Sequence, residues 1–234
     1  MFIIQEAMII KMNLLIWNKT KEYIVYSIYF FYAINNYLLF WIFWKLLYNK
    51  YMRIIAGKYK GKKLAEFELN STRPTSDLMR EAMFDKIGLN IVDSVFLDLF
   101  SGTGACGIEA LSRNAKECYF VDKNKDAIKI IKKNLQSIGK NDENVFYNDF
   151  ENVLNIFAKK QIKFDIVFLD PPYASDYAEK AIQILLKNQL LNDGYIIVWE
   201  HDDTKNDYIG NAFIDAKTKK YGNKYLTYIV KQNV

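Results

Sequence analysis

The sequence contains very few of the residues that build metal sites and disulfide frameworks. Among 234 residues there is one histidine, His201, and there are two cysteines, Cys106 and Cys118. A zinc site needs a cluster of cysteine and histidine ligands, so no metal is expected. A single histidine also gives little support to a nucleophile activated by a histidine base. Two cysteines are too few for a disulfide framework, which favours the reducing cytoplasm as the location of the protein.

The remaining composition is that of a globular protein. Hydrophobic residues make up 51% of the chain and charged residues 25%, which excludes a wholly disordered polypeptide. The formal net charge of +5 is small, so a polyanionic partner is permitted but not required. A chain of this length is expected to form one domain with a short appendage.

Residues 1–51 differ from the rest, because no charged residue occurs in the 22 positions from Tyr23 to Trp44. That length would span a membrane, and the lysines that follow would then keep the rest of the chain in the cytoplasm. However, Asn35 and Asn36 interrupt the apolar run, and no signal-peptide cleavage site is present. We expect residues 1–51 to be upstream sequence translated from a start codon placed too early, with Met52 as the true first residue. A membrane-anchoring helix and a buried helix are the alternatives.

Residues 52–88 predict a basic hairpin followed by a helix. Glycine turns at Gly57 and Gly61 separate two short segments, and a turn over residues 72–77 precedes an apolar face made by Leu78, Ala82, Met83 and Ile87. The hairpin carries five positive charges without an acid, which favours contact with RNA phosphates, although such runs are often only solvated. The predicted RNA-binding residues are Arg53, Lys58, Lys60, Lys62, Lys63, Arg73 and Arg80; the last two could instead close over a cofactor.

Strands and helices alternate through residues 89–234. Strands are expected at 95–99, 117–121, 144–147, 164–169, 195–199, 212–217 and 225–230, and helices at 105–113, 125–138, 151–158 and 177–187. Such alternation builds a mostly parallel sheet with helices on both faces, which is a Rossmann-like α/β fold.

A glycine-rich loop lies between the first of these strands and its helix. Alone, this G-x-G-x-x-G pattern also fits a nicotinamide cofactor or an ordinary turn. Asp98 at the start of the loop would repel a pyrophosphate and attract an ammonium group, and Asp122 ends the next strand, where a carboxylate can hold ribose hydroxyls. S-adenosylmethionine is therefore the expected cofactor. The predicted cofactor-binding residues are Asp98, Phe100, Gly102, Gly104, Asp122 and Asp149.

The strand over 164–169 is followed by Asp170-Pro171-Pro172-Tyr173, a sequence suited to methylating a nucleobase amine. The Asp170 carboxylate and the Pro171 carbonyl can accept hydrogen bonds from an exocyclic amine, while the Tyr173 ring stacks on the base. These acceptors would aim the nitrogen lone pair at the sulfonium methyl group. The four residues are therefore predicted to be catalytic, the alternative being a proline turn that only ends the strand.

From Met52 on, the chain resembles the bacterial 16S ribosomal RNA guanine-N2 methyltransferases of the RsmD type. The resemblance rests on residues 52–61, 72–75, 98–104, 107–113, 120–123, 164–173 and 200–201. It implies a class I S-adenosylmethionine-dependent methyltransferase fold with a seven-stranded sheet. It also implies methylation of one guanine of 16S rRNA in an assembling small ribosomal subunit.

Other functions are compatible with parts of the pattern. A DNA adenine-N6 or cytosine-N4 methyltransferase could use the same Asp170 socket, but no insertion after residue 52 is long enough for a target-reading domain. A nicotinamide-dependent oxidoreductase is disfavoured by Asp98 and by the two prolines. A membrane-anchored, non-catalytic protein with a methyltransferase fold is the alternative from a different class.

Overall fold

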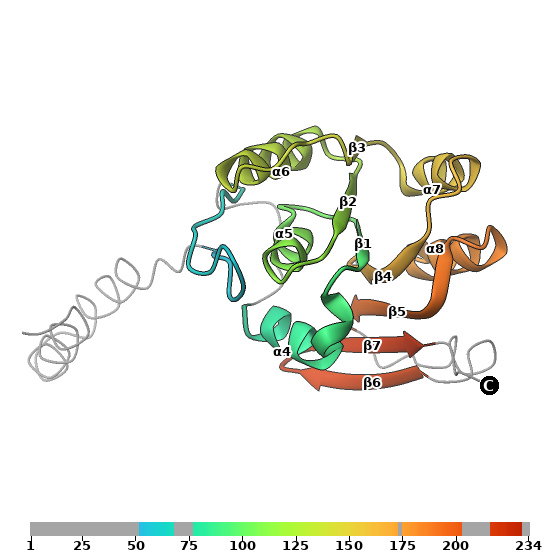
Figure 1. The fold of residues 1–234 in the computed structure, drawn as a ribbon. Coiled ribbons are helices and arrows are strands. Elements are labelled where there is room, and N and C mark those ends of the chain that lie inside the picture. Colours follow the sequence, from blue (N-terminus) through green and yellow to red (C-terminus); the bar gives the residue numbers. More distant parts are fainter. Residues whose placement is uncertain (1–51, 68–76, 173–174, 203–215, 231–234) are drawn as a thin grey trace, which may run out of the picture. The chain divides into compact units, whose positions relative to one another are not determined.

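The computed structural model describes residues 52–67, 77–172, 175–202 and 216–230 (Figure 1). The extension over residues 1–51, with its uncharged run, lies outside the described residues. Within the described ranges, no helix is both long enough and apolar enough to cross a membrane.

Within these described ranges, seven strands form one sheet in the order β3-β2-β1-β4-β5-β7-β6. The strands are β1 (Val95–Leu99), β2 (Glu117–Asp122), β3 (Val145–Tyr147), β4 (Phe164–Leu169), β5 (Leu191–His201), β6 (Ala216–Tyr221) and β7 (Lys224–Val230). β1 to β5 pair in parallel, and β7 runs antiparallel between β5 and β6. The predicted seven-stranded, mostly parallel sheet is confirmed.

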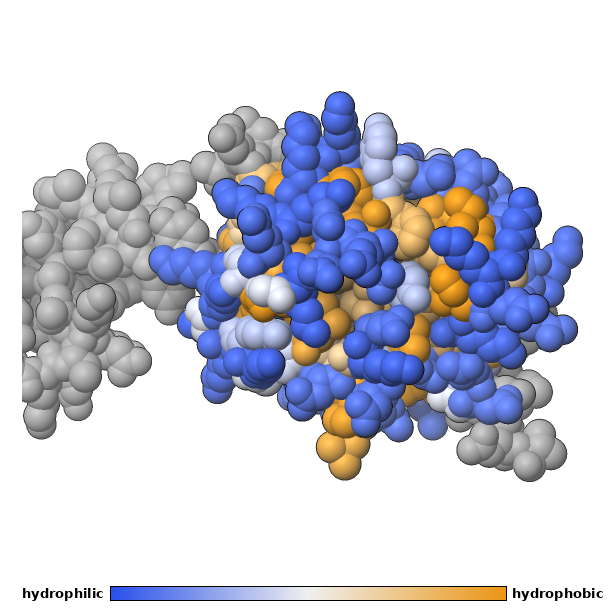
Figure 2. Space-filling model, turned by 45° about the horizontal axis from the view of Figure 1, so that its top comes forward, coloured by the Kyte–Doolittle hydropathy of each residue, from blue (hydrophilic) through white to orange (hydrophobic). Residues whose placement is uncertain are grey.

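Helices cover both faces of this sheet (Figure 1). They are α4 (Asp77–Ile87), the 3-10 helix η1 (Gly88–Ile91), α5 (Ala105–Ser112), α6 (Lys125–Ser137), α7 (Phe150–Lys159) and α8 (Tyr177–Lys187). α4, α5 and α6 lie on one face, and α7 and α8 on the other. Successive residues of a strand point to opposite faces of the sheet, so they join different hydrophobic cores. Phe96 packs in the core beneath α4, α5 and α6, and Leu97 in the core beneath α7 and α8. The face in Figure 2 is mostly hydrophilic, as expected when apolar side chains turn inward.

Two local predictions were wrong. The strand expected at 212–217 does not end at Lys217 but continues as β6 to Tyr221, because the β6–β7 turn lies at Gly222 and Asn223 and pairs Tyr221 with Lys224; positions 212–215 of that prediction lie outside the described residues. In α4 the predicted apolar position Leu78 is 71% exposed, whereas Arg80 is fully buried. The Arg80 Nη2 donates to the Arg53 carbonyl and to Asp77 Oδ1, at 2.7 and 3.0 Å, so one end of the buried guanidinium pairs with a carboxylate.

The basic hairpin is present and docks on α5 through its backbone. Arg53 and Lys63 form a bridge, and Glu109 of α5 accepts hydrogen bonds from the N–H groups of Ile55 and Ala56 at 2.7 and 2.9 Å. Ser112 adds bonds to the hairpin, accepting from the Tyr59 N–H at 3.0 Å and donating to the Ala56 carbonyl at 2.5 Å. Because Glu109 is buried, these bonds are shielded from water and fix the hairpin on the helix.

Gly107 allows α5 to approach β2 closely. A Cβ atom built at this position would lie 2.3 Å from Phe120 Cε1 and 2.5 Å from Cys118 Sγ, which is closer than real contacts permit. The third glycine of the loop pattern therefore serves helix–strand packing rather than ligand contact.

We predict that Gly107→Ala lowers the free energy of unfolding by about 1–3 kcal/mol, because the added methyl overpacks the helix–strand contact. Helix propensity alone would give the opposite sign, a gain of about 1 kcal/mol. Urea denaturation would measure the change. Cys118→Ala in the same chain should recover part of the loss, since it removes one of the three atoms closer than 3.0 Å. A stabilised Gly107→Ala protein would contradict this account of the packing.

Candidate active site

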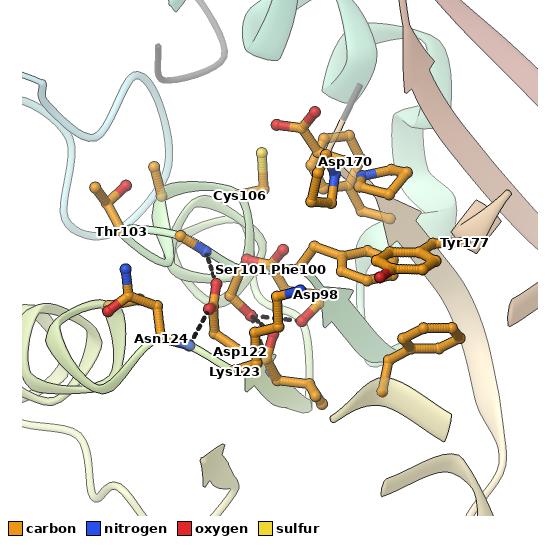
Figure 3. A pocket seen from close by; sticks show the side chains of 18 of the residues that line it. Asp98, Phe100, Ser101, Thr103, Cys106, Asp122, Lys123, Asn124, Asp170 and Tyr177 are labelled. Atoms are coloured by element: carbon orange, nitrogen blue, oxygen red, sulfur yellow. Dashed lines mark hydrogen bonds between the residues drawn. The ribbon is translucent and has the colours of Figure 1, made fainter. Parts of the chain in front are cut away.

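The two motifs singled out from the sequence open onto one cavity of about 490 Å³ (Figure 3). The cavity lies at the carboxyl ends of β1, β2 and β4, where parallel sheets place their ligand sites. Its walls come from the glycine-rich loop, the end of β2, the start of α7 and the turn after β4. A volume of this size is typical of small-molecule sites.

The Asp122 carboxylate organises the glycine-rich loop. Its Oδ2 accepts a hydrogen bond from the Gly102 N–H at 2.8 Å, and its Oδ1 accepts one from the Asn124 N–H at 2.7 Å (Figure 3). Each carboxylate oxygen has two lone pairs, so both oxygens can still accept from a ligand hydroxyl. Partial burial raises the pKa of Asp122 from its ordinary value, although these N–H bonds act in the opposite direction.

Asp98 combines a structural bond with a place on the cavity wall. It is 1% exposed, and its Oδ2 accepts a hydrogen bond from the Gly107 N–H at 2.9 Å. Burial raises the pKa of Asp98 to about 8 despite that bond, and the Asp122 charge acts in the same direction as burial. A cationic ligand group beside it would favour the carboxylate form.

An aromatic wall closes another side of the cavity. The ring centroids of Phe100 and Phe150 lie 5.2 Å apart, and Tyr177 stacks on Phe100 at 6.2 Å. Phe100 has a φ of 69°, in the left-handed region that non-glycine residues rarely adopt. Strained backbone conformations of this kind cluster at functional sites. Asp149 caps α7 beside this wall, accepting from the Glu151 N–H at 2.9 Å. A flat aromatic ring such as adenine could stack on this wall through its faces.

At the other end of the cavity, Asp170, Pro171 and Pro172 line the turn after β4. Burial raises the pKa of Asp170 to about 8; the nearby Glu200 carboxylate acts in the same direction, and the Lys224 ammonium opposes it. Glu200 itself is buried and accepts a hydrogen bond from Lys224 Nζ. The protonation of Asp170 therefore depends on the charges at the ends of β5 and β7.

The structure brings most of the predicted cofactor and catalytic residues to this cavity. Those that line it are Asp98, Phe100, Gly102, Asp122, Asp149, Asp170, Pro171 and Pro172. Gly104 does not line it; with a φ of 76° it forms the turn into α5 and lies against Ile131. Tyr173 lies outside the described residues. Phe150 and Tyr177 were not predicted, although Phe150 directly follows Asp149 and this position was a usable signal.

The predicted RNA-binding residues fall into two groups. The hairpin side chains are all exposed to solvent: Arg53, Lys58, Lys60, Lys62 and Lys63. Arg80 was predicted to bind RNA or to close over a cofactor, but its guanidinium is buried and bonded to the protein, which leaves it unable to reach RNA phosphates. Arg73 lies outside the described residues.

The residues present fit S-adenosylmethionine. Asp122 offers acceptors for ribose hydroxyls, the aromatic wall suits adenine, and the buried Asp98 suits an ammonium group. Among the described residues, no cluster of histidine, cysteine, aspartate or glutamate could hold a metal ion.

We predict that Asp122→Asn weakens the binding of S-adenosylhomocysteine, the product form of the cofactor, by about tenfold or more. Whichever way the new amide is turned, its NH2 group would face the N–H donor of Gly102 or that of Asn124. Two donors facing one another would disturb the loop. Isothermal titration calorimetry would measure the affinity. Asp126→Asn is the matched control, since Asp126 is exposed, does not line the cavity, and pairs through its carboxylate with Lys129 on α6. Equal affinities for the Asp122→Asn and wild-type proteins would contradict the assignment.

Comparison with known sequences places this site in a family. The chain is 40% identical over 152 residues to YlbH of Bacillus subtilis, provisionally named an rRNA methyltransferase; the match covers 64% of this chain and 83% of that protein. It is 36% identical over 156 residues to ribosomal RNA small subunit methyltransferase D of Haemophilus influenzae, covering 66% and 80%.

Solved structures agree with the fold. The Escherichia coli protein yhhF, provisionally named a methyltransferase, superposes with a TM-score of 0.65 at 31% identity, over 76% of this chain and 97% of that one. The Thermus thermophilus 16S rRNA N2 G1207 methyltransferase, solved with AdoMet and guanosine, gives a TM-score of 0.58 at 19% identity, which shows likeness of fold alone. It covers 71% of this chain and 45% of that one.

A family model described as conserved hypothetical protein 95 matches residues 52–230. The match spans the hairpin, the sheet and both motifs of the cavity, and it agrees with the resemblance found from the motifs. The chain therefore belongs to this family, the RsmD family, together with the ribosomal RNA small subunit methyltransferases D.

Proposed function

We propose that this protein transfers a methyl group from S-adenosylmethionine to the exocyclic N2 amine of a guanine in 16S ribosomal RNA. One observation carries the proposal: the glycine-rich loop after β1 and the Asp170–Pro172 turn after β4 line the same cavity. A methyl donor held by the first and an amine held by the second would meet there. The Haemophilus influenzae relative supplies the class of substrate, since it is named for the small-subunit RNA.

S-adenosylmethionine supplies a methyl group on a positively charged sulfur, and the protein's residues supply position and polarity. Asp122 would hold the ribose, the Phe100 wall the adenine, and Asp98 the ammonium group. An exocyclic amine is a poor nucleophile because its lone pair is conjugated into the base. Hydrogen bonds from the amine to Asp170 and to the Pro171 carbonyl would turn that lone pair towards the methyl group.

The remaining assignments belong to the same proposal. Tyr173 would stack on the flipped-out guanine, contributing about 1–3 kcal/mol. The exposed basic side chains of the hairpin, such as Lys58 and Lys62, would bind phosphates beside the target. We further propose that the substrate is an assembling small subunit in the cytoplasm. We also propose that residues 52–88 form an RNA-binding unit in front of a methyltransferase domain over residues 89–234.

Transfer assays with tritiated S-adenosylmethionine would test the substrate. We predict methylation of small-subunit particles that carry unmodified 16S rRNA, with the label in N2-methylguanine, and no transfer to duplex DNA. Binding to the RNA should weaken steeply with salt because phosphate contacts release counterions. Label in N6-methyladenine or N4-methylcytosine of DNA would instead identify the protein as a DNA methyltransferase.

A second prediction concerns Asp170, whose raised pKa makes catalysis depend on pH. Only the ionised carboxylate can accept hydrogen bonds at both of its oxygens, and Asp170 becomes ionised as the pH rises through about 8. The kcat/KM should therefore rise by up to tenfold per pH unit below that value and level off above it.

Asp170→Asn keeps a neutral acceptor, so its kcat/KM should be lower and nearly independent of pH between 6 and 9. Asp170→Ala should reduce kcat by about 100-fold or more while S-adenosylhomocysteine still binds. Near-normal turnover by Asp170→Ala, or a flat wild-type profile, would contradict the proposed role.

A further inference from the structure

Asn134, on α6, connects two parts of the chain that lie far apart in sequence. Its side chain is 1% exposed, and every polar hydrogen of its amide is used. Oδ1 accepts from the Ala65 N–H at 2.7 Å, and Nδ2 donates to the Ala65 carbonyl at 3.1 Å and to the Thr103 carbonyl at 3.0 Å. Ala65 follows the basic hairpin, and Thr103 belongs to the glycine-rich loop. One buried amide therefore holds both backbones together.

The two residues after Ala65 belong to the cavity. Glu66 and Phe67 line it together with Thr103, although they lie outside the sheet and its crossover loops. A second link supports the same junction: the Met52 N–H donates to Glu66 Oε1, and Thr103 Oγ1 contacts Met52 Sδ at 3.3 Å. The chain that leaves the hairpin thus forms a wall of the cavity on the side of Thr103, which is labelled in Figure 3.

We propose that Asn134 is a positioning residue for the cofactor: it holds the 65–67 segment against the glycine-rich loop and so completes the wall of the S-adenosylmethionine site. Neither Asn134 nor this segment belongs to a sequence motif described above. The inference rests on the proposed function only in that the cavity receives S-adenosylmethionine.

The energetics favour a large effect from this single side chain. Removing the amide takes its partner from the buried Thr103 carbonyl and from the partly buried Ala65 N–H and carbonyl, and each unpaired group costs free energy. The chain can avoid the cost by moving the 65–67 segment outwards, where water can bond to it. That movement would open the cavity wall on its Thr103 side.

The test is the affinity of the purified protein for S-adenosylhomocysteine, measured by calorimetry without RNA. Asn134→Ala is expected to raise the Kd by about tenfold or more. In steady-state assays it should raise the KM for S-adenosylmethionine, with little change in kcat at saturating cofactor or in the KM for RNA. If Asn134 only stabilised the fold, the KM for S-adenosylmethionine would not rise while kcat and the KM for RNA stayed nearly unchanged.

Ser112→Ala is the matched control. Ser112 is also buried on a helix and also bonds to two backbone groups of the hairpin segment, but it does not line the cavity. Its Kd for S-adenosylhomocysteine should stay within about twofold of the wild-type value. Loss of affinity to the same extent in both variants would overturn the proposal, because general loosening of the hairpin would then be the cause. Wild-type affinity in Asn134→Ala would overturn it directly.

Phe67→Ala keeps the test decisive should Asn134→Ala fail to fold, because it removes part of the wall without leaving a buried polar group unpaired. It is expected to raise the same Kd by several-fold, and an unchanged value would show that the segment is not part of the site. These measurements use no RNA, so their failure is separable from failure of the guanine assignment. Transfer to DNA in place of 16S rRNA would likewise leave the role of Asn134 intact.

Discussion

The hydrogen bond from the Gly107 N–H to Asp98 Oδ2 is the constraint on which the site depends. It joins the end of β1 to the first turn of α5 across the loop that faces the cavity, and it lies away from water. Gly107 also sets the separation of α5 from β2, because no side chain fits there. The loop between these fixed points has little freedom, so Gly102 and Thr103 are held in place before any ligand binds.

The same helix carries the hairpin, which makes α5 the common support of two functions. Its first turn shapes the cavity, while Glu109 and Ser112 near its end hold the backbone of the basic segment. Asn134 reaches the returning chain of that segment from α6. The basic surface and the cavity are therefore fixed relative to one another through rigid elements rather than through a linker.

The sequence was sufficient for those parts of the fold that depend on local pattern. The short apolar run over 164–169 and the helix over 177–187 have the bounds that periodicity predicts. The aspartates that follow strands, such as Asp122 and Asp170, reach one cavity because parallel strands end at the same edge.

What the sequence could not supply depended on long-range contacts. The aromatic wall joins Phe100 to Tyr177, far apart in the chain, and neither spacing nor composition pairs them. Arg80 was predicted to bind RNA or to close over a cofactor, yet the Arg53 carbonyl of the hairpin and the Asp77 carboxylate hold its guanidinium inside. The end of β6 at Tyr221 depends on the turn at Gly222, a signal that the sequence contains. For Glu66 and Phe67, only tertiary structure shows their place at the cavity.

The docking of the hairpin through main-chain atoms has a consequence for how this protein can change over evolutionary time. Glu109 and Ser112 bond to backbone amides and a carbonyl, which every residue type except proline provides. The bonds that Glu109 and Ser112 make to the hairpin use none of its lysine side chains. The number and charge of the hairpin lysines can change over evolution, or be redesigned for another RNA, while the hairpin stays bound to α5.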